Sequence, residues 1–159
     1  MNKKVLIIIL IMVAVLIVAT MYIVCTDSNS EDNQIFNPEI PVIESVEGHI
    51  VVAVQHLDGR MIIPGTHFPY VDGETAYTAY SALRLAATLS SYSGMQSIVT
   101  RGSGRMLYVS AMAGLSERER GPASGWVFEV NGERIGISAG VFELSEGDVV
   151  LWRYTVDGR

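Results

Sequence analysis

Four aromatic side chains near the end of the chain are the best candidates for binding chemistry. Trp126 and Phe128 are separated by one residue, as are Trp152 and Tyr154, so each pair lies on one face of an extended strand. The chain has a single cysteine and therefore no internal disulfide, so at least one aromatic pair is needed in the core. The other pair, if exposed, forms a platform for a planar apolar ligand, beside backbone amides that meet its polar rim. The predicted ligand-binding residues are Ser124, Gly125, Trp126, Phe128, Trp152 and Tyr154.

Reactive side chains elsewhere lack the setting that catalysis or metal binding requires. Ser103 lies between two glycines, but the Gly-x-Ser-x-Gly elbow of hydrolases is absent. No helix is expected after residues 102–104, so this stretch does not predict a phosphate-binding loop. His49 and His56 are an odd number of residues apart on one predicted strand and point to opposite faces, and His67 adds no ligand cluster. We therefore predict no catalytic residues, no metal ligands and no required cofactor, and a protein that is not an enzyme.

The charge balance argues against nucleic acid as a partner. The chain has 11 basic and 17 acidic residues, and its only lysines are Lys3 and Lys4. Without these two, nine arginines remain against 17 acidic residues, a net charge of −8 for the rest of the chain. A surface that binds phosphates needs clustered basic residues, whereas these arginines are scattered among more numerous carboxylates.

The N-terminal segment, residues 1–25, predicts a membrane anchor. An uncharged apolar run from Val5 to Val24 follows the two lysines, and about 20 such residues span a bilayer as a helix. Two alternatives are a cleaved secretory signal and a lipoprotein signal ending at Cys25. Residues 22–24 are large, which disfavours both, so we favour an uncleaved anchor. The lysines stay cytoplasmic. The expected location is the cell membrane, single-pass, with the C-terminal part extracytoplasmic.

A polar segment follows the anchor and precedes the folded domain. Residues 26–47 are rich in Asp, Ser, Asn and Glu and contain Pro38 and Pro41, which favour extended backbone. We predict an extracytoplasmic linker over 26–47 and a folded domain over 48–159.

Hydrophobic periodicity predicts the first elements of this domain. Residues 49–57 alternate as a strand, Asp58-Gly59 marks a turn, and residues 61–63 form a return strand that ends at Pro64-Gly65. A helix capped by Thr75 runs to about Leu89, with alanines on the face that packs against the sheet.

The second half of the domain is predicted to consist of strands and turns. Residues 96–100 and 106–112 predict two strands, and residues 116–124 an exposed loop. Asn131-Gly132 follows an apolar strand and predicts a hairpin turn, because both residues accept a positive φ. Gly147 and Asp148 predict another tight turn before the final strand, residues 149–154, with Asp148 accepting from nearby amides.

These motifs together resemble the C-terminal domain of the transcobalamin and intrinsic factor family, a module that occurs alone in prokaryotic surface proteins as DUF4430. The resemblance covers roughly residues 49–158. It rests on a helix opened by Glu74-Thr75, the segment 108–115, the Ser-Gly-Trp to Val-Asn-Gly run over 124–132, and the terminal Gly-Asp-Val at 147–149.

The resemblance implies a β-grasp-like fold, that is, an α+β sheet packed against a single helix, here preceded by a transmembrane helix. It also implies a binding role with cobalamin or a related corrinoid as ligand. One of the three histidines could serve as an axial ligand to cobalt, but the absence of a ligand cluster favours scattered, solvated or partly buried histidines. In the vertebrate members a large helical domain covers the other side of the cofactor, so we expect weak affinity here or a partner that completes the site. The alternative is a structural or adhesion-type module of the cell surface that binds a protein partner by edge-strand pairing and takes no small molecule.

Overall fold

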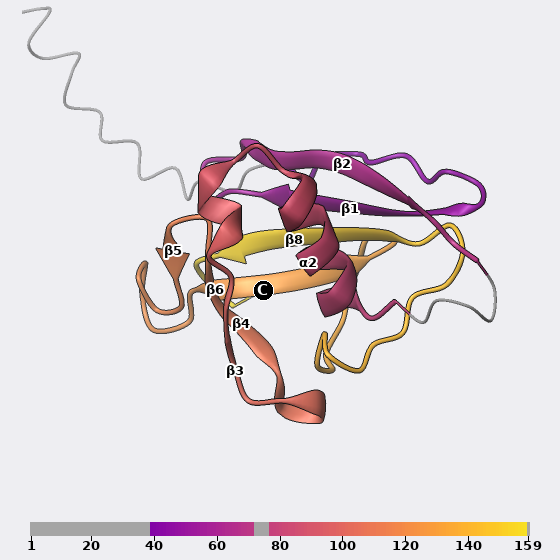
Figure 1. Cartoon of the computed structure of the whole chain (residues 1–159). Coiled ribbons are helices and arrows are strands. Elements are labelled where there is room, and N and C mark those ends of the chain that lie inside the picture. Colours follow the sequence, from indigo (N-terminus) through magenta and orange to yellow (C-terminus); the bar gives the residue numbers. More distant parts are fainter. Residues whose placement is uncertain (1–38, 72–76, 159) are drawn as a thin grey trace, which may run out of the picture. The chain divides into compact units, whose positions relative to one another are not determined.

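The computed structural model describes residues 39–71 and 77–158, which contain one α-helix and two β-sheets (Figure 1). These residues belong to one compact unit. Within them no helix is both long and apolar enough to cross a membrane, and the predicted anchor, residues 1–25, lies outside them.

The elements are β1 (His49–Gln55), β2 (Met61–Pro69), α2 (Ala79–Leu89), the 3₁₀ turn η2 (Ser93–Gln96), β3 (Val99–Arg101), the 3₁₀ turn η3 (Gly104–Met106), β4 (Tyr108–Met112), β5 (Leu115–Ser116), β6 (Gly125–Val130), β7 (Glu133–Arg134) and β8 (Val149–Thr155).

The larger sheet has the strand order β2-β1-β8-β6-β7. β1 pairs in parallel with the last strand, β8, while the β1–β2, β6–β8 and β6–β7 pairs are antiparallel. The parallel pair needs a long crossover, and α2 lies within it, against one face of the sheet (Figure 1). The smaller sheet has the order β3-β4-β5. The expected α+β class, a sheet packed against one helix, is thus confirmed for the described residues.

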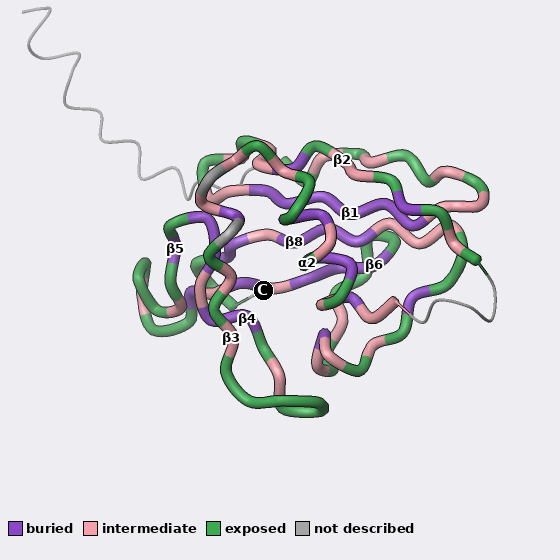
Figure 2. The backbone as a smooth tube through the Cα atoms, in the orientation of Figure 1, coloured by how far each residue is buried: buried purple, intermediate pink, exposed green. Residues whose placement is uncertain are grey.

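Strand alternation places the core between the sheet and α2. Ile50, Val52 and Val54 of β1 are buried in one cluster with the helix residues Leu83 and Ala86. The same cluster holds the apolar side chains of β6 and β8 that share this face. Figure 2 shows the buried stretches along β1, β6 and β8. Short alanine side chains on the buried helix face let the helix backbone approach the strands closely, as the pattern predicted.

The helix begins at Ala79 and its N-cap is Thr78, so the prediction that Thr75 caps it is wrong. The Thr78 hydroxyl accepts from the Ser81 N–H at 3.1 Å, and the Ser81 hydroxyl accepts from the Thr78 N–H at 2.9 Å. This reciprocal capping box satisfies two amide groups that the first helical turn leaves unpaired. Thr75 itself lies outside the described residues.

Strand β2 continues through Pro64-Gly65 to Pro69, so the prediction that the return strand ends there is also wrong. β2 is the edge strand of its sheet and Pro64 is exposed, so its missing N–H costs no ladder bond. The β1–β2 pairing is irregular opposite Pro64 and Gly65, with register shifts between Val52 and Val54 and between Val54 and Gln55.

The predicted turns in the last third are confirmed. Asn131 and Gly132 have φ values of 54° and 82°, and Val130 pairs directly with Glu133 across them. Gly147 has a φ of 80°, and an Asp148 carboxylate oxygen accepts from the Ser145 N–H at 2.7 Å. The two turns are also joined to each other, because the Asn131 side-chain amide donates to Asp148 at 2.8 Å.

The described part of the predicted linker packs on the back of the larger sheet. The Gln55 amide donates to the Glu39 carbonyl at 3.0 Å, and residues 40–43 line a hollow of about 310 Å³ together with residues of β6 and β8. Because of this cover, Val51 and Ala53 are fully buried although they point away from the helix.

The smaller sheet begins later than predicted. The turn η2 occupies Ser93–Gln96, so β3 starts only at Val99. The connection between β3 and β4 contains the turn η3 and projects away from the larger sheet, with an exposed tip (Figure 2). Gly102 in this connection has a φ of 70°, and a Cβ there would lie 2.2 Å from the Met106 carbonyl oxygen, so only glycine fits.

Candidate functional site

An open cavity of about 410 Å³ lies between the β3–β4 connection, β6 and the loop that follows β7. Its lining comprises residues 105–109, 126–128 and 134–139, together with Trp152. We call it the aromatic cavity. Its volume is within the range of small-molecule sites, and its walls come from segments distant in the sequence.

Aromatic rings form the inner part of the aromatic cavity. Phe128 and Trp152 stack with their ring centroids 5.1 Å apart and their planes inclined by 27°. Both rings are buried, and Phe142 packs edge-on against Phe128 at 6.0 Å. The Trp152 Nε1 atom has no hydrogen-bond partner among the described residues but is itself inaccessible, so it offers no donor to a ligand in this conformation. The stacked pair therefore gives the aromatic cavity a rigid, apolar inner wall.

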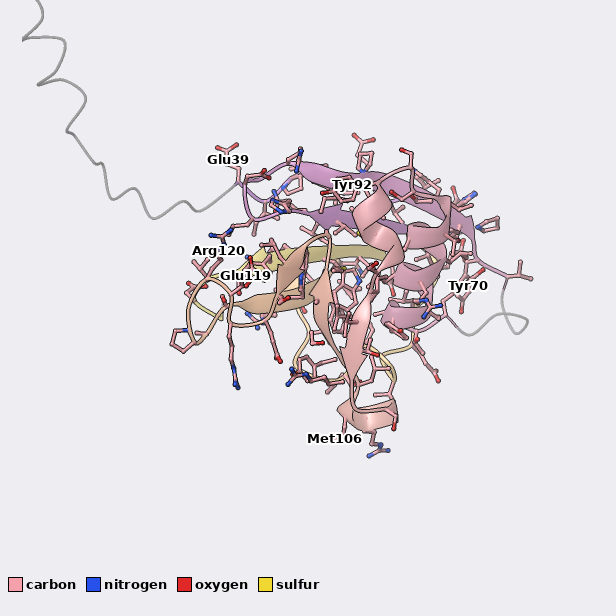
Figure 3. The ribbon with its side chains drawn as sticks, turned by 60° about the vertical axis from the view of Figure 1, so that its left-hand side comes forward. Glu39, Tyr70, Tyr92, Met106, Glu119 and Arg120 are labelled. Atoms are coloured by element: carbon pink, nitrogen blue, oxygen red, sulfur yellow. The ribbon has the colours of Figure 1, made fainter. Side chains whose placement is uncertain are left out.

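Exposed apolar side chains gather around the mouth of the aromatic cavity. Met106 is 77% exposed, Ile137 58% and Tyr108 42%, and all three line the cavity. Figure 3 shows Met106 at the tip of the β3–β4 connection, pointing outward. Exposed apolar residues are ordinary when scattered, but a group of them at the rim of one cavity is typical of an interaction site.

Ser138 joins the two walls of the aromatic cavity. Its hydroxyl oxygen lies 2.7 Å from the Gly104 carbonyl oxygen and 2.6 Å from that of Leu107, and it accepts from the Gly140 N–H at 3.1 Å. One hydroxyl proton is shared between the two carbonyls. The loop after β7 is thereby held against η3, more than 30 residues away along the chain.

The charged residues at the aromatic cavity are basic. Arg105 and Arg134 line it, and no aspartate or glutamate does. The Tyr108 hydroxyl at its edge donates to Glu117 at 2.5 Å, and Arg101 pairs with the same carboxylate at 2.9 Å. The hydrogen bond to Glu117 raises the pKa of Tyr108 above its usual value, so this hydroxyl stays protonated at neutral pH.

Both predicted aromatic pairs are buried, so neither forms an exposed platform. Trp126 and Phe128 are 8% and 6% exposed, Trp152 and Tyr154 2% and 3%, and all four lie on the helix side of the sheet. The core role that was expected for at least one pair therefore applies to both. Three of these rings, those of Trp126, Phe128 and Trp152, nevertheless line the aromatic cavity.

The other three predicted residues lie outside that lining and have structural partners. The Ser124 and Tyr154 hydroxyls are 3.0 Å apart, and Tyr154 also donates to the Ser116 carbonyl at 2.6 Å. The Ser124 N–H, predicted to meet a ligand, donates to the Gly121 carbonyl at 3.0 Å. Gly125 pairs with Thr155 in the β6–β8 ladder. These bonds hold the loop 117–124 against the end of the larger sheet.

The histidines do not assemble a metal centre in the described ranges. No group of three or more His, Cys, Asp or Glu side chains with metal-binding geometry occurs over residues 39–71 and 77–158. The His49 and His67 rings contact edge-on at 6.5 Å, and His56 lies 3.1 Å from Asp58. The backbone N–H of Arg60 and the neighbouring His56 lower the pKa of Asp58.

Sequence reasoning missed the residues that complete the aromatic cavity, namely Arg105, Arg134, Ile137 and Ser138. The segment 133–141 carries no motif, and its residues acquire a role only through η3, which they contact in the folded chain. The sequence indicated this segment's role only indirectly, through an apolar residue, Ile137, in a loop between polar turns.

Comparisons with known proteins bear on the fold. A search of curated proteins found no significant match. Haptocorrin, solved in a complex with Cbi, matches 69% of this chain with 15% identity and a TM-score of 0.51, which supports a shared fold. This chain spans only 26% of the haptocorrin chain.

A second solved structure and a family profile also match. The structure is of a protein from Ruminococcus gnavus ATCC 29149 described as a candidate metal-binding protein, with 18% identity and a TM-score of 0.45 over 69% of this chain and 97% of that one. The profile, described as "Domain of unknown function (DUF4430)", matches residues 70–156. That range contains every residue that lines the aromatic cavity and more than half of the chain, and the chain therefore belongs to the DUF4430 family.

Proposed function

We propose that the folded part of this chain is a non-enzymatic, β-grasp-like ligand-binding module whose ligand occupies the aromatic cavity. The observation that carries the proposal is the stacked Phe128–Trp152 pair at the inner end of a 410 Å³ cavity with an exposed apolar rim. A ligand that covered Met106 and Ile137 would remove their apolar surface from water, which favours binding.

Cobalamin or a related corrinoid is the candidate ligand. A corrin is broad, largely apolar on its faces and polar at its rim, so one edge of it suits a cavity with aromatic walls and polar groups at the mouth. The volume accommodates part of such a molecule and leaves the remainder outside. Affinity for the isolated chain is therefore expected to be weak, unless a partner covers the other side.

The module is proposed to be held outside the cell by the apolar segment, residues 1–25. That segment lies outside the described residues, and its apolar run after Lys3 and Lys4 carries this part of the proposal. Protein that remains in membranes after alkaline extraction, with an N-terminus before Val5, would support a retained anchor. A mature chain beginning after Val24, or acylated at Cys25, would contradict it.

Ligand binding is tested by titrating the full chain, in a mild non-ionic detergent, with cobalamin and cobinamide. Corrinoid absorbance and calorimetry follow the binding, and saturable binding of either is expected. Ile137→Ser removes an apolar side chain from the rim, with an expected loss of up to roughly tenfold in affinity if the ligand buries that side chain. Ile40→Ser is the matched control, because Ile40 is similarly exposed, at 54%, but lies outside the aromatic cavity.

Equal affinity in Ile137→Ser and wild type would mean that a corrinoid binds elsewhere on the protein. Absence of saturable binding at millimolar concentration would remove corrinoids as ligands. Capture of a protein partner by the full chain from the same cell envelope would then favour the adhesion-type alternative.

A further inference from the structure

Two arginines at the aromatic cavity lack the carboxylate partners that half of the arginines in the described ranges have. Arg60, Arg101, Arg120 and Arg153 each lie within 4.0 Å of an aspartate or glutamate oxygen. Arg105 and Arg134 form no such ion pair within residues 39–71 and 77–158, and both are exposed. Their guanidinium groups are therefore available to a ligand.

The acidic residues that adjoin these arginines in the chain or in the sheet are already paired or point away. Glu129 stands opposite Arg134 in the β6–β7 pair, but its carboxylate is buried and lies 2.6 Å from Arg153. Glu133 precedes Arg134 in β7, and neighbouring residues of a strand point to opposite faces. Glu117, beyond Tyr108 at the edge of the cavity, is occupied by Arg101 and the Tyr108 hydroxyl. The cavity thus carries local positive charge in a chain whose net charge is −6.

Basic charge and aromatic surface together select a particular class of ligand. Arg105 lies in η3 on one wall and Arg134 in β7 on another, and both walls are joined through Ser138. Guanidinium groups bind phosphate and carboxylate through paired, charge-assisted hydrogen bonds. The stacked rings between the walls suit a flat apolar body.

We propose that Arg105 and Arg134 form an oxyanion-binding subsite at the mouth of the aromatic cavity, and that the cavity accepts flat ligands carrying a phosphate or carboxylate group. This inference rests on the proposed function, since it concerns the same cavity. The two arginines add a requirement for an anionic group on the ligand.

The test compares riboflavin with flavin mononucleotide, probes that share one ring system and differ by a phosphate. The full chain in non-ionic detergent is titrated into each probe, and flavin fluorescence and anisotropy report binding. Flavin mononucleotide is expected to bind wild-type protein at least about tenfold more tightly than riboflavin. Added sodium chloride should weaken the binding of flavin mononucleotide and leave riboflavin unaffected, because salt screens exposed charges.

The variant Arg105→Gln/Arg134→Gln should lose about tenfold in affinity for flavin mononucleotide and keep its affinity for riboflavin. The matched control is Arg84→Gln/Arg118→Gln, which removes the same charge from two exposed arginines outside the cavity. The control should bind both probes as wild type does. The salt series on wild-type protein provides a readout that does not depend on how the variants fold.

Three results would overturn the inference. Equal affinity of wild-type protein for the two flavins would show that the cavity does not recognise the phosphate, while the proposed ligand-binding function would stand. An equal loss in the control variant would assign the effect to overall charge. If neither flavin bound at millimolar concentration, the cavity would not accept a flat anion of this kind. The corrinoid titration would still test the proposed ligand-binding function independently.

Discussion

Replacing Ser138 by alanine should loosen the two walls of the aromatic cavity. The Ser138 hydroxyl shares one proton between the Gly104 and Leu107 carbonyls, at 2.7 and 2.6 Å, and accepts from the Gly140 N–H at 3.1 Å. The substitution therefore removes one shared and one accepted hydrogen bond. At about 1 kcal/mol net for each, the free energy of unfolding should fall by about 1 to 2 kcal/mol. The lower part of this range is favoured, because Ser138 is only half-buried and water can reach the groups it leaves.

The assay is urea unfolding of the full chain, followed by tryptophan fluorescence. The chain has two tryptophans, Trp126 and Trp152, and both are buried in the core, so the signal reports the folded domain. Hydrogen exchange provides a local readout. Amides of residues 104–107 and 138–140 should exchange faster in Ser138→Ala, while those of β1 should change only as far as global stability does. Flavin and corrinoid affinities should fall together, because both ligands need the two walls in place.

The matched control is Ser103→Ala. Ser103 is an exposed serine one residue before η3, and its side chain makes no capping hydrogen bond there. Its substitution should change the free energy of unfolding by no more than about 0.5 kcal/mol and should leave the amide exchange rates of residues 104–107 and 138–140 as in wild type. If Ser138→Ala matched Ser103→Ala in both measurements, the Ser138 bonds would not hold the walls together and the reasoning would be refuted.

Two further predictions concern the framework around the site. Arg153→Met should destabilise the domain by about 3 to 5 kcal/mol, because the Glu129 carboxylate is 4% exposed and its pairing with Arg153 at 2.6 Å would be lost. Glu129→Leu/Arg153→Met should recover most of that loss in urea unfolding, and a double variant no more stable than the single one would contradict the ion-pair explanation. Gly102→Ala should lower the free energy of unfolding clearly more than its control Gly104→Ala. Both glycines have a positive φ, and a left-handed conformation costs about 1 to 2 kcal/mol for an alanine at either position. Only at Gly102 would the new Cβ also clash with a carbonyl oxygen, at 2.2 Å. Equal unfolding midpoints for the two alanine variants would remove the steric argument.

Local signals in the sequence predicted the turns well and the ends of elements less well. Asn131-Gly132 and Gly147-Asp148 were predictable because a positive φ or an Asx hydrogen bond depends on only a few neighbouring residues. The helix start was misplaced by three residues, because Thr75 and Thr78 are chemically equivalent caps. The choice of Thr78 involves the reciprocal bond with Ser81 and an isolated bridge from Thr78 to Glu143, which brings in a distant segment.

The end of β2 depended on information that lies outside the strand. Pro64 ends a central strand but is tolerated at an edge, and the edge position follows from the order of the whole sheet. The packing of residues 39–43 on the back of the sheet was likewise not predicted, because the polar composition of the segment 26–47 as a whole indicated a linker although Ile40, Val42 and Ile43 are apolar. The bond from Gln55 to the Glu39 carbonyl exists only because β1 is central and presents Gln55 to that face.

The sequence by itself determined the α+β class, the family, the hairpin turns and the apolar strands that carry Trp126, Phe128, Trp152 and Tyr154, because periodicity and turn chemistry act over a few residues. Only the tertiary structure decided that both aromatic pairs are buried on the same face, since that outcome depends on β6 pairing with β8 beneath the helix. It also decided which residues meet at the aromatic cavity. Arg105, Arg134 and Ser138 become neighbours of that core because the fold brings η3 and the loop after β7 together, and no local pattern specifies a contact across more than 30 residues of chain.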